Sequence, residues 1–387
     1  MQLVAYGAQD IYLTGNPQIT FFKVVYRRHT NFAMESIEQT FNGATGYGRR
    51  VTATISRNGD LIKDMWLEVF FTKDTTGDDQ TTFKYGYGNA LVKQVEIEIG
   101  GQLIDRQYGE WLDIWSELSV PEGKRAGYDE MVGNTGANAK IDVPLMFWFN
   151  RNPGLALPLI ALQYHEVKIN LDIGAEADVN TKWDSAPTAL TALKLWVDYI
   201  YLDTDERRRF AQVSHEYLIE QLQFTGDAAI SGTSFRSELN FNHPCKELIW
   251  VCQIAAQVRG SGNTASQPCQ FTTLEVPASN PGATAILKLN GQDRFQERRM
   301  EYFRRVQGFK HHTHSVRTAN EQYIYLYSFA LNPEEHQPSG TCNFSRIDNT
   351  VLSFSNTPSR TGVVKVFAVN YNVLRIMSGM GGLAYSN

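Results

Sequence analysis

Apolar and polar residues alternate with a period of two in many short segments of the chain, and this pattern narrows its fold more than any other feature. The clearest case is "VEIEI", residues 95–99, which is followed by Gly100 and Gly101 and then by "QLID". A period of two places successive side chains on opposite faces of a strand, and two glycines suit the tight turn of a hairpin. The sequence therefore predicts a β-hairpin here.

The same alternation recurs over the whole chain, in residues 167–172, 193–202, 323–329 and 363–374. Helical spacing is rare. In "EWLDIWSEL", one helical face would carry Trp111, Ile114, Trp115 and Leu118. A second helix is predicted over residues 293–306, with Asp293 as its capping residue. The chain is therefore predicted to be all-β, with a few short helices inserted between strands.

Three strand-like segments of the first half recur in the same order in the second half. The pairs are Ile37 in "IEQTFNG" with Ile219 in "IEQLQFTG", Trp66 in "DMWLEV" with Trp250 in "ELIWVC", and Val197 in "LWVDYIYL" with Val369 in "VFAVNYNVL". A chain of 387 residues is long enough for two domains. The repeats favour two copies of one β-domain, and about eight strand candidates in each half fit a two-sheet sandwich or jelly roll.

The two halves meet at a charged segment that is poor in strand pattern, "DTDERRRFAQVSHEY". We therefore predict an N-terminal arm over residues 1–28, a first jelly roll over 29–204, a linker over 205–216 and a second jelly roll over 217–387. Two polar, glycine-rich segments, residues 72–89 and 257–284, are predicted to be long surface loops.

Composition argues against several classes of protein. A net charge of −5 is unlike that of a dedicated nucleic-acid binder, so no direct nucleic-acid partner is expected. The N-terminal residues lack the basic and apolar regions of a signal peptide, and the richest apolar stretches are far shorter than the roughly 20 residues of a membrane span. None of the four cysteines has C-x-x-C spacing. A soluble protein with reduced thiols is expected.

Catalytic patterns are incomplete. The segments "HEVKI" at His165 and "HEYLI" at His215 begin like a zinc-protease helix, but Ile169 and Ile219 stand where the second histidine is needed. No nucleophile elbow and no phosphate-binding loop is present. We therefore predict no catalytic, cofactor-binding or metal-binding residue, no cofactor and no enzymatic activity.

Two polar clusters leave alternatives open. In "HHTH", residues 311–314, His312 and His314 would share one face of a strand and could ligate a metal, although no Cys, Asp or Glu adjoins them. They could equally form a solvated or interface cluster that makes assembly sensitive to pH. Residues 294–317 carry seven cations that suit phosphate, an anionic membrane, a neighbouring subunit or a solvated helix face: Arg294, Arg298, Arg299, Arg304, Arg305, Lys310 and Arg317.

Long blocks of the sequence resemble the major capsid proteins of nucleocytoplasmic large DNA viruses. They include "LVAYGAQDIYLTGNPQITFFKVVYRRHTNFAMESIEQTF", "IGGQLIDRQYGEWLDIW", "PLMFWFNRNPGLALPLIALQYHEVKI", "NHPCKELIWV", "ALNPEEHQPSGTCNFSRIDN" and "NVLRIMSGMGGLAYSN". The resemblance implies a double jelly roll, that is, two tandem eight-stranded sandwiches. It implies a homotrimer with a pseudo-hexagonal outline, which tiles the icosahedral shell of a large double-stranded DNA virus.

The resemblance also implies partners and a location. The expected partners are further copies of the chain, neighbouring capsomers, minor capsid proteins and penton proteins, and the expected location is the virion after assembly in the host cytoplasm. The N-terminal arm would lie under the capsomer, towards minor proteins or the internal membrane. Its sticky segment "NPQITFFKVVYRRHTNF" contains Phe21, Phe22, Tyr26, Arg27 and Arg28. The alternative is that residues 19–26 form an extra strand of the first domain.

Two other functions remain open at this stage. A carbohydrate-binding module would use exposed aromatic residues in its loops, for which Tyr85 and Tyr87 are candidates and Phe271 is the only aromatic of the second long loop. A metal-dependent enzyme on a β-sandwich would depend on residues 311–314 alone.

Overall fold

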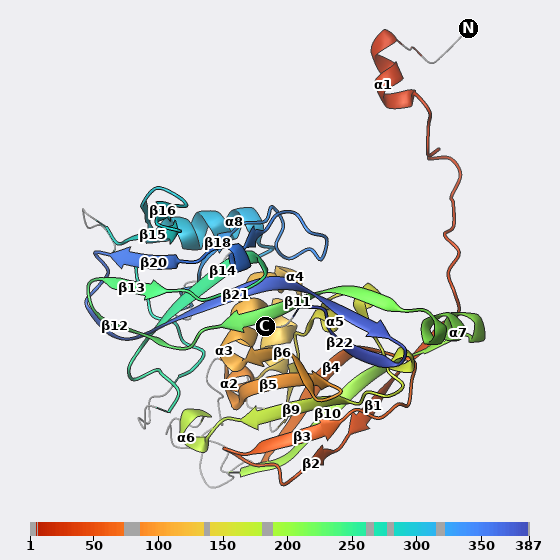
Figure 1. The fold of residues 1–387 in the computed structure, drawn as a ribbon, viewed down its shortest axis with the longest axis horizontal. Helices are drawn as coiled ribbons and strands as arrows, with labels where there is room; N and C mark the ends of the chain where they lie inside the picture. The colour runs from red at the N-terminus through yellow and green to blue at the C-terminus, as the bar shows by residue number, and fades with distance from the viewer. Residues whose placement is uncertain are drawn as a thin grey trace.

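The computed structural model describes residue 5 and residues 7–72, 86–134, 140–179, 189–260, 267–276, 282–314 and 322–385, which form two pairs of β-sheets (Figure 1). The strands of the first half are β1 (Phe32–Gln39), β2 (Phe41–Asn42), β3 (Arg50–Thr54), β4 (Leu61–Thr72), β5 (Val92–Ile99), β6 (Gln102–Tyr108), β7 (Lys140–Pro144), β8 (Leu157–Pro158), β9 (Val167–Ile173) and β10 (Ala189–Leu202). Those of the second half are β11 (His215–Phe224), β12 (Ala228–Gly232), β13 (Phe235–Glu238), β14 (Pro244–Ile254), β15 (Thr284–Leu289), β16 (Gln292–Asp293), β17 (Arg298–Arg299), β18 (Tyr325–Ser328), β19 (Cys342–Asn343), β20 (Thr350–Ser355), β21 (Arg360–Met377) and β22 (Met380–Leu383).

Short helices lie between these strands. The helices are η1 (Ala8–Asp10), α1 (Ile11–Thr14), α2 (Tyr87–Leu91), α3 (Gly109–Ser119), α4 (Glu122–Met131), α5 (Trp148–Arg151), η2 (Pro153–Leu155), η3 (Leu159–Ala161), α6 (Glu176–Val179), α7 (Thr204–Gln212), the π-helix η4 (Tyr302–Val306), α8 (Gln307–His311) and η5 (Phe344–Arg346). Within the described residues, no helix is long and apolar enough to cross a membrane.

Both halves contain the same two antiparallel sheets. The order β1-β10-β4-β7 in the first half corresponds to β11-β21-β14-β18 in the second, and β3-β9-β5-β6 corresponds to β13-β20-β15-β16. Neighbouring strands come from distant parts of the sequence, as in β1 beside β10, which is the connectivity of a jelly roll. The remaining short strands extend these eight-stranded units. The fold predicted from the sequence is therefore confirmed.

The sequence repeats lie on corresponding strands. Ile37 and Ile219 belong to β1 and β11, and Val197 and Val369 to β10 and β21. The tryptophan pair belongs to β4 and β14, but the two side chains face opposite ways. Trp250 is buried in the second core, whereas Trp66 lies half-buried on the outer face of its sheet. The valine pair differs in the same way, because Val197 lies in the first core and Val369 on the outer face that contacts α3. The repeat is therefore correct strand by strand, and its residue alignment is wrong in both of these pairs.

A separate apolar core fills each sandwich. In β4, Met65, Leu67 and Val69 point inward and are almost fully buried, while the residues between them are partly exposed. This is the alternation expected for a sheet with one solvated face. The second core is built around Trp250, which lies close to the rings of Phe303 and Phe354.

The predicted hairpin and one predicted helix are confirmed. Strands β5 and β6 pair across Gly100 and Gly101, whose φ angles of 60° and 83° favour glycine. Helix α3 covers the predicted "EWLDIWSEL" segment. The helix predicted to start at Asp293 is wrong in its first part, because the Asn290-Gly291 turn continues into β16 and the following residues form β17. Helical structure begins only at Met300.

The segment between the halves is helix α7, capped by the side chain of Asp203, which accepts a hydrogen bond from the Glu206 amide at 3.0 Å. The division into arm, linker and jelly rolls at residues 28, 204 and 216 stays a prediction. Of the predicted loop at 72–89, residues 73–85 lie outside the described part of the chain. The described parts of 257–283 contain no strand.

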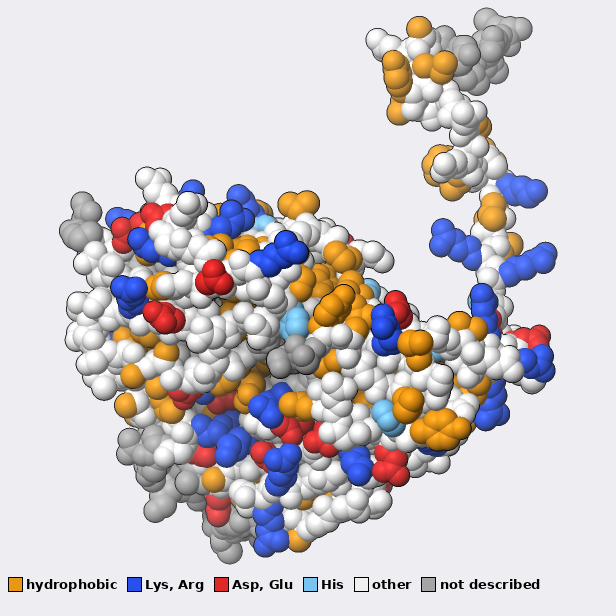
Figure 2. Space-filling model, viewed as in Figure 1, with side chains coloured by type: hydrophobic (Ala, Val, Ile, Leu, Met, Phe, Trp, Pro, Cys, Tyr) orange, Lys and Arg blue, Asp and Glu red, His pale blue; other side chains and the backbone are white. Residues whose placement is uncertain are grey.

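The N-terminal residues extend away from the body (Figure 1). After α1, described residues 15–31 form neither helix nor strand and are exposed along their whole length. The alternative in which residues 19–26 add a strand to the first sandwich is therefore wrong. Figure 2 shows apolar and basic side chains side by side along this arm.

Candidate functional site

The two sandwiches of the chain contact each other across a buried interface, and helix α3 forms the centre of this interface. An apolar cluster joins Trp111, Ile114, Trp115 and Leu118 of α3 to the outer face of the β11-β21-β14-β18 sheet, at Ile249, Val251, Phe367 and Val369. The rings of Trp111 and Phe367 lie 5.6 Å apart. This sheet is thus buried on both faces, by its own core and by the first half.

A buried ion cluster lies at the N-terminal end of α3. The Glu110 carboxylate meets the Lys365 ammonium of β21 at 3.2 Å and the Arg259 guanidinium at 3.4 Å. Burial by itself raises the pKa of Glu110, but Lys365 and Arg259 lower it by more, to about 2. The carboxylate is therefore charged at neutral pH and ties the first half to two segments of the second.

A second buried cluster links α5 to β11 and β14. One oxygen of Glu220 accepts from Lys246 at 2.7 Å, and the other accepts from Arg151 at 2.9 Å. Burial raises the pKa of Glu220, but the His336 ring 3.8 Å away and the charges of Arg151 and Lys246 lower it to about 2. Because both Glu220 oxygens accept hydrogen bonds from cations, this cluster stabilises the contact between the halves and leaves no free carboxylate for catalysis.

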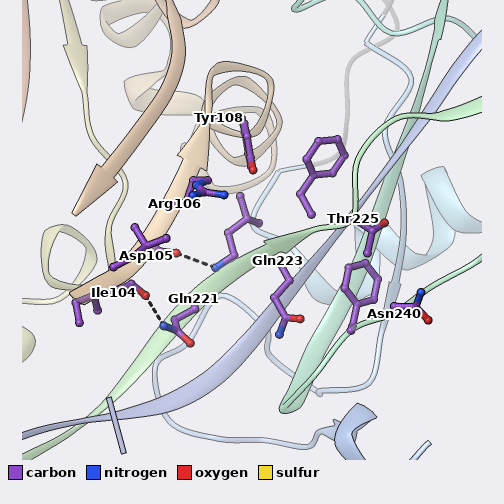
Figure 3. Close-up of a pocket in the computed structure, with 12 residues that line it drawn as sticks. Ile104, Asp105, Arg106, Tyr108, Gln221, Gln223, Thr225 and Asn240 are labelled. Atoms are coloured by element: carbon purple, nitrogen blue, oxygen red, sulfur yellow. Dashed lines mark hydrogen bonds between the residues drawn. The ribbon is translucent and has the colours of Figure 1, made fainter. Parts of the chain in front are cut away.

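The sandwiches also meet edge to edge, at strands β6 and β11 (Figure 3). The Gln221 side chain donates to the Ile104 carbonyl, and the Leu222 amide donates to Asp105 at 3.0 Å. Burial raises the pKa of Asp105 to about 6, although the hydrogen bonds from the Leu222 amide and the Gln107 side chain oppose the rise. A cleft of about 280 Å³ opens beside this contact and is lined by polar side chains of both strands. Each edge strand therefore covers the other, which protects both from aggregation.

The C-terminal hairpin of β21 and β22 closes the opposite end of the interface. A Cβ at Gly381 would lie 2.5 Å from Leu162 and 3.3 Å from Ile99, both in the first half. The Gly381 amide and carbonyl both contact His165 Nδ1, at 3.1 and 2.9 Å. The glycines of "MSGMGGL" are thus needed for close approach between the halves, and His165 holds the hairpin rather than a metal.

The histidine cluster is placed differently from the prediction. His311 ends α8 and His312 and His314 follow it, so they do not share a strand face. His312 is buried between Glu247 and Glu334, each 2.9 Å away. His314 Nε2 lies 2.8 Å from Glu122 of the first half. Across the described residues, no group of three or more His, Cys, Asp or Glu side chains is arranged to hold a metal ion.

Other sequence candidates are also structural. His215 contacts the Phe210 carbonyl at 2.8 Å, and Arg304 is buried against Glu275, which accepts from it at 2.7 Å. Tyr87 and Phe271 are buried and cannot form an exposed sugar platform. Tyr85 and Arg317 lie outside the described residues. Within the described part of the chain, the observations that favoured a lectin or a metal enzyme are thus lost.

Sequence reasoning missed the buried ion clusters. A signal was present for one cluster, because Lys365 in "VVKVFAV" is a single lysine among apolar residues. The signal at Lys246 is weaker, because Glu247 follows it directly. Lysine is almost never fully buried without a partner. Such positions indicate a buried acid elsewhere in the chain, although the sequence does not identify which one.

Comparison with known proteins decides the family. The N-terminal domain of major capsid proteins matches residues 20–203, and the model "Large eukaryotic DNA virus major capsid protein" matches residues 206–382. The chain belongs to this family of major capsid proteins. It is 53% identical to the major capsid protein of Pyramimonas orientalis virus and 47% identical to that of Paramecium bursaria Chlorella virus 1, in both cases over 100% of this chain and 99% of the relative.

Solved structures agree. A chain of the quasi-atomic PBCV-1 virus capsid is 41% identical and superposes with a TM-score of 0.80, covering 95% of this chain and 100% of that one. The Faustovirus major capsid protein has a TM-score of 0.76 at 13% identity, over 96% and 94% of the two chains, and supports the fold alone. The resemblance predicted from the sequence is therefore confirmed. As a major capsid protein, the chain is a component of a virus shell and is located in the virion.

Proposed function

We propose that three copies of this major capsid protein form a pseudo-hexagonal capsomer, and that capsomers tile the icosahedral shell of a large double-stranded DNA virus. The supporting observation is the rigid contact between two sandwiches of the same connectivity. One chain supplies two similar blocks in a fixed relation, so three chains supply six blocks around a three-fold axis. The role is structural, with no enzymatic activity, and assembly takes place in the host cytoplasm.

The capsomer makes a direct prediction for electron microscopy of the purified protein. Negatively stained particles are expected to have a six-lobed outline with three-fold symmetry. Contacts within the trimer must be large, above about 2,000 Å² in total for an obligate assembly. Contacts between capsomers, and those with minor capsid and penton proteins, can be smaller so that assembly errors are reversible. Two-lobed particles of one chain would contradict the proposal.

The N-terminal arm is proposed to bind on the inner side of the shell, to minor capsid proteins and against the internal membrane. Phe21, Phe22 and Tyr26 are each more than four-fifths exposed, which is costly for aromatic side chains in water. Lys23, Arg27 and other basic residues alternate with them. This composition suits a partner surface that is both apolar and acidic, such as a minor protein or anionic headgroups.

Deleting residues 1–16 is expected to leave a folded trimer and to impair shell assembly. The described residues of the deleted segment belong to neither core, because all of them but the partly exposed Asp10 are exposed. The mass of the purified variant and the yield of closed particles in infected cells are the two readouts. A full-length Phe21→Ser/Phe22→Ser variant separates loss of apolar contact from loss of length. If the deletion variant formed complete particles at normal yield, the proposed role of the arm in assembly would be wrong.

A further inference from the structure

Among the described residues, one sheet has an outer face that no other element covers and that carries aromatic side chains. On the outer side of β1-β10-β4-β7, Trp66 and Trp196 stand opposite each other in adjacent strands, with ring centroids 6.3 Å apart and planes within 11° of parallel. Phe70 lies on the same face, near the ammonium groups of Lys140 and Lys194. All three aromatic side chains are only half-buried. Three large rings on a solvated sheet face indicate a contact surface.

The corresponding sheet of the second half is already covered. Its outer face packs against α3, which follows β6 and precedes β7 in the first half. Within the chain, therefore, the helix that connects two strands of the first sandwich covers the outer face of the second sandwich. The repeat of the fold raises the question of what covers the β1-β10-β4-β7 sheet.

The second half has a helix in the position equivalent to α3. Residues 300–311, comprising η4 and α8, follow β16 and β17 and precede β18, just as α3 lies between β6 and β7. This helix turns Phe303 and Arg304 into its own core but leaves Phe309 81% exposed and Val306 partly exposed. Arg305 and Lys310 are exposed beside them. The helix packs on β18 of its own chain with its inner side, and its outward face is apolar, basic and exposed.

We propose that helix 300–311 of one copy packs on the outer face of the β1-β10-β4-β7 sheet of the next copy, in the way that α3 packs on β11-β21-β14-β18 within the chain. This inference rests on the proposed capsomer and assigns its seam. In Figure 1, α8 lies at the upper end of the body and β1 and β10 at the lower end, so the two surfaces cannot meet within one chain. A head-to-tail contact of this kind closes into a ring when its rotation allows.

The chemistry of the two surfaces is complementary. Figure 2 shows Lys and Arg side chains on the upper part of the body, where Figure 1 places α8, interspersed with acidic ones as on the rest of this face. Arg305 and Lys310 would face Trp66 and Trp196, and arginine and lysine are attracted to the faces of tryptophan rings. The carboxylates of this sheet face, Glu38 and Glu68, are already paired with Lys194 at 3.0 Å and with Lys140 at 2.6 Å, so the attraction is assigned to the aromatic rings. Phe309 would add the central apolar contact, as aromatic residues do in stable interfaces.

Cross-linking tests the seam directly. A Lys194→Cys/Lys310→Cys variant places one thiol on each surface without removing an aromatic ring, and three of the native cysteines are buried. With a short bismaleimide, the double variant is expected to give covalent dimers and trimers, with trimer as the largest product because the ring is closed. Each single variant and the parent protein serve as controls and should give no such products. A ladder beyond trimer would contradict the closed ring.

A matched pair of substitutions supplies the second readout. Phe309→Asp is expected to raise the concentration at which the trimer dissociates by at least about tenfold, whereas Phe22→Asp on the arm leaves it unchanged. Neither side chain is buried, so both variants should fold. If the wild type is a trimer but the double-cysteine variant does not cross-link and Phe309→Asp does not weaken the trimer, the proposed seam is wrong and the proposed capsomer still stands. A wild-type protein that is monomeric would overturn both.

Discussion

Replacing Trp111 with alanine is expected to destabilise the protein by about 3 to 5 kcal/mol, the range for removing a fully buried tryptophan. The Trp111 ring stacks on Trp115 in its own helix and contacts Phe367 in the second half, each at 5.6 Å. The cavity would therefore open at the contact between the two sandwiches rather than inside either core. Calorimetry is expected to show a lower melting temperature, with the transitions of the two halves separating.

The control for this prediction is Phe22→Ala, which removes an aromatic ring that is 99% exposed and should leave the melting temperature unchanged. A Trp111→Ala protein that melts as one transition at the wild-type temperature would show that α3 does not couple the halves. That result would remove the main support for a rigid two-block subunit.

Replacing His312 with leucine is expected to cost roughly 3 to 5 kcal/mol, because Glu247 is left buried and unpaired. The His312 ring lies between Glu247 and Glu334 at 2.9 Å from each, and Glu247 is fully buried. Burial by itself lowers the pKa of His312, but the two carboxylates raise it by more, to about 9. The histidine is thus a cation at neutral pH. It forms ion pairs with Glu247 and Glu334 and is not part of a metal site.

The same ion pair predicts a pH dependence with a defined sign. A histidine whose folded pKa is raised from 6.5 to about 9 stabilises the protein fully below pH 6.5 and loses that contribution as the pH rises through 9. The melting temperature of the wild type is therefore expected to fall between pH 7 and 9.5, and this component of the fall should be absent in His312→Leu. The exposed His29 provides the control, since His29→Leu should follow the wild type. Parallel pH curves for His312→Leu and the wild type would refute the assignment.

The strands could be predicted where one sheet face is solvated and the other is buried. β4, β5 and β10 have that alternation, so these strands of the first sandwich can be predicted from the sequence. Strands β14 and β21 are buried on both faces, by the second core and by α3. β14 accordingly reads as an apolar run from Leu248 to Cys252, while the alternation of β21 does not mark a solvated face. Their similarity to the first-half strands identified the repeat, but the side-chain direction of Trp250 could not follow from it.

The interface between the halves could not be predicted, because its partners are far apart in the chain. Glu110 and Lys365 are 255 positions apart, and Arg151 and Glu220 are 69 positions apart. The histidine cluster failed for the same reason: Glu247 and Glu334 do not adjoin it in sequence. The helix over 293–306 failed locally, since the turn at Asn290 and Gly291 commits the next residues to strand pairing before the helix begins.

The most direct test of a trimeric capsomer is the mass of the purified protein in solution, measured by light scattering coupled to size-exclusion chromatography. A trimeric capsomer should appear as one stable species at three times the chain mass of 43.8 kDa. Deleting residues 1–16 should leave it trimeric, and Phe309→Asp should reduce the trimer fraction. A single species at the mass of one chain, at protein concentrations well above those at which shells assemble, would contradict the trimeric capsomer.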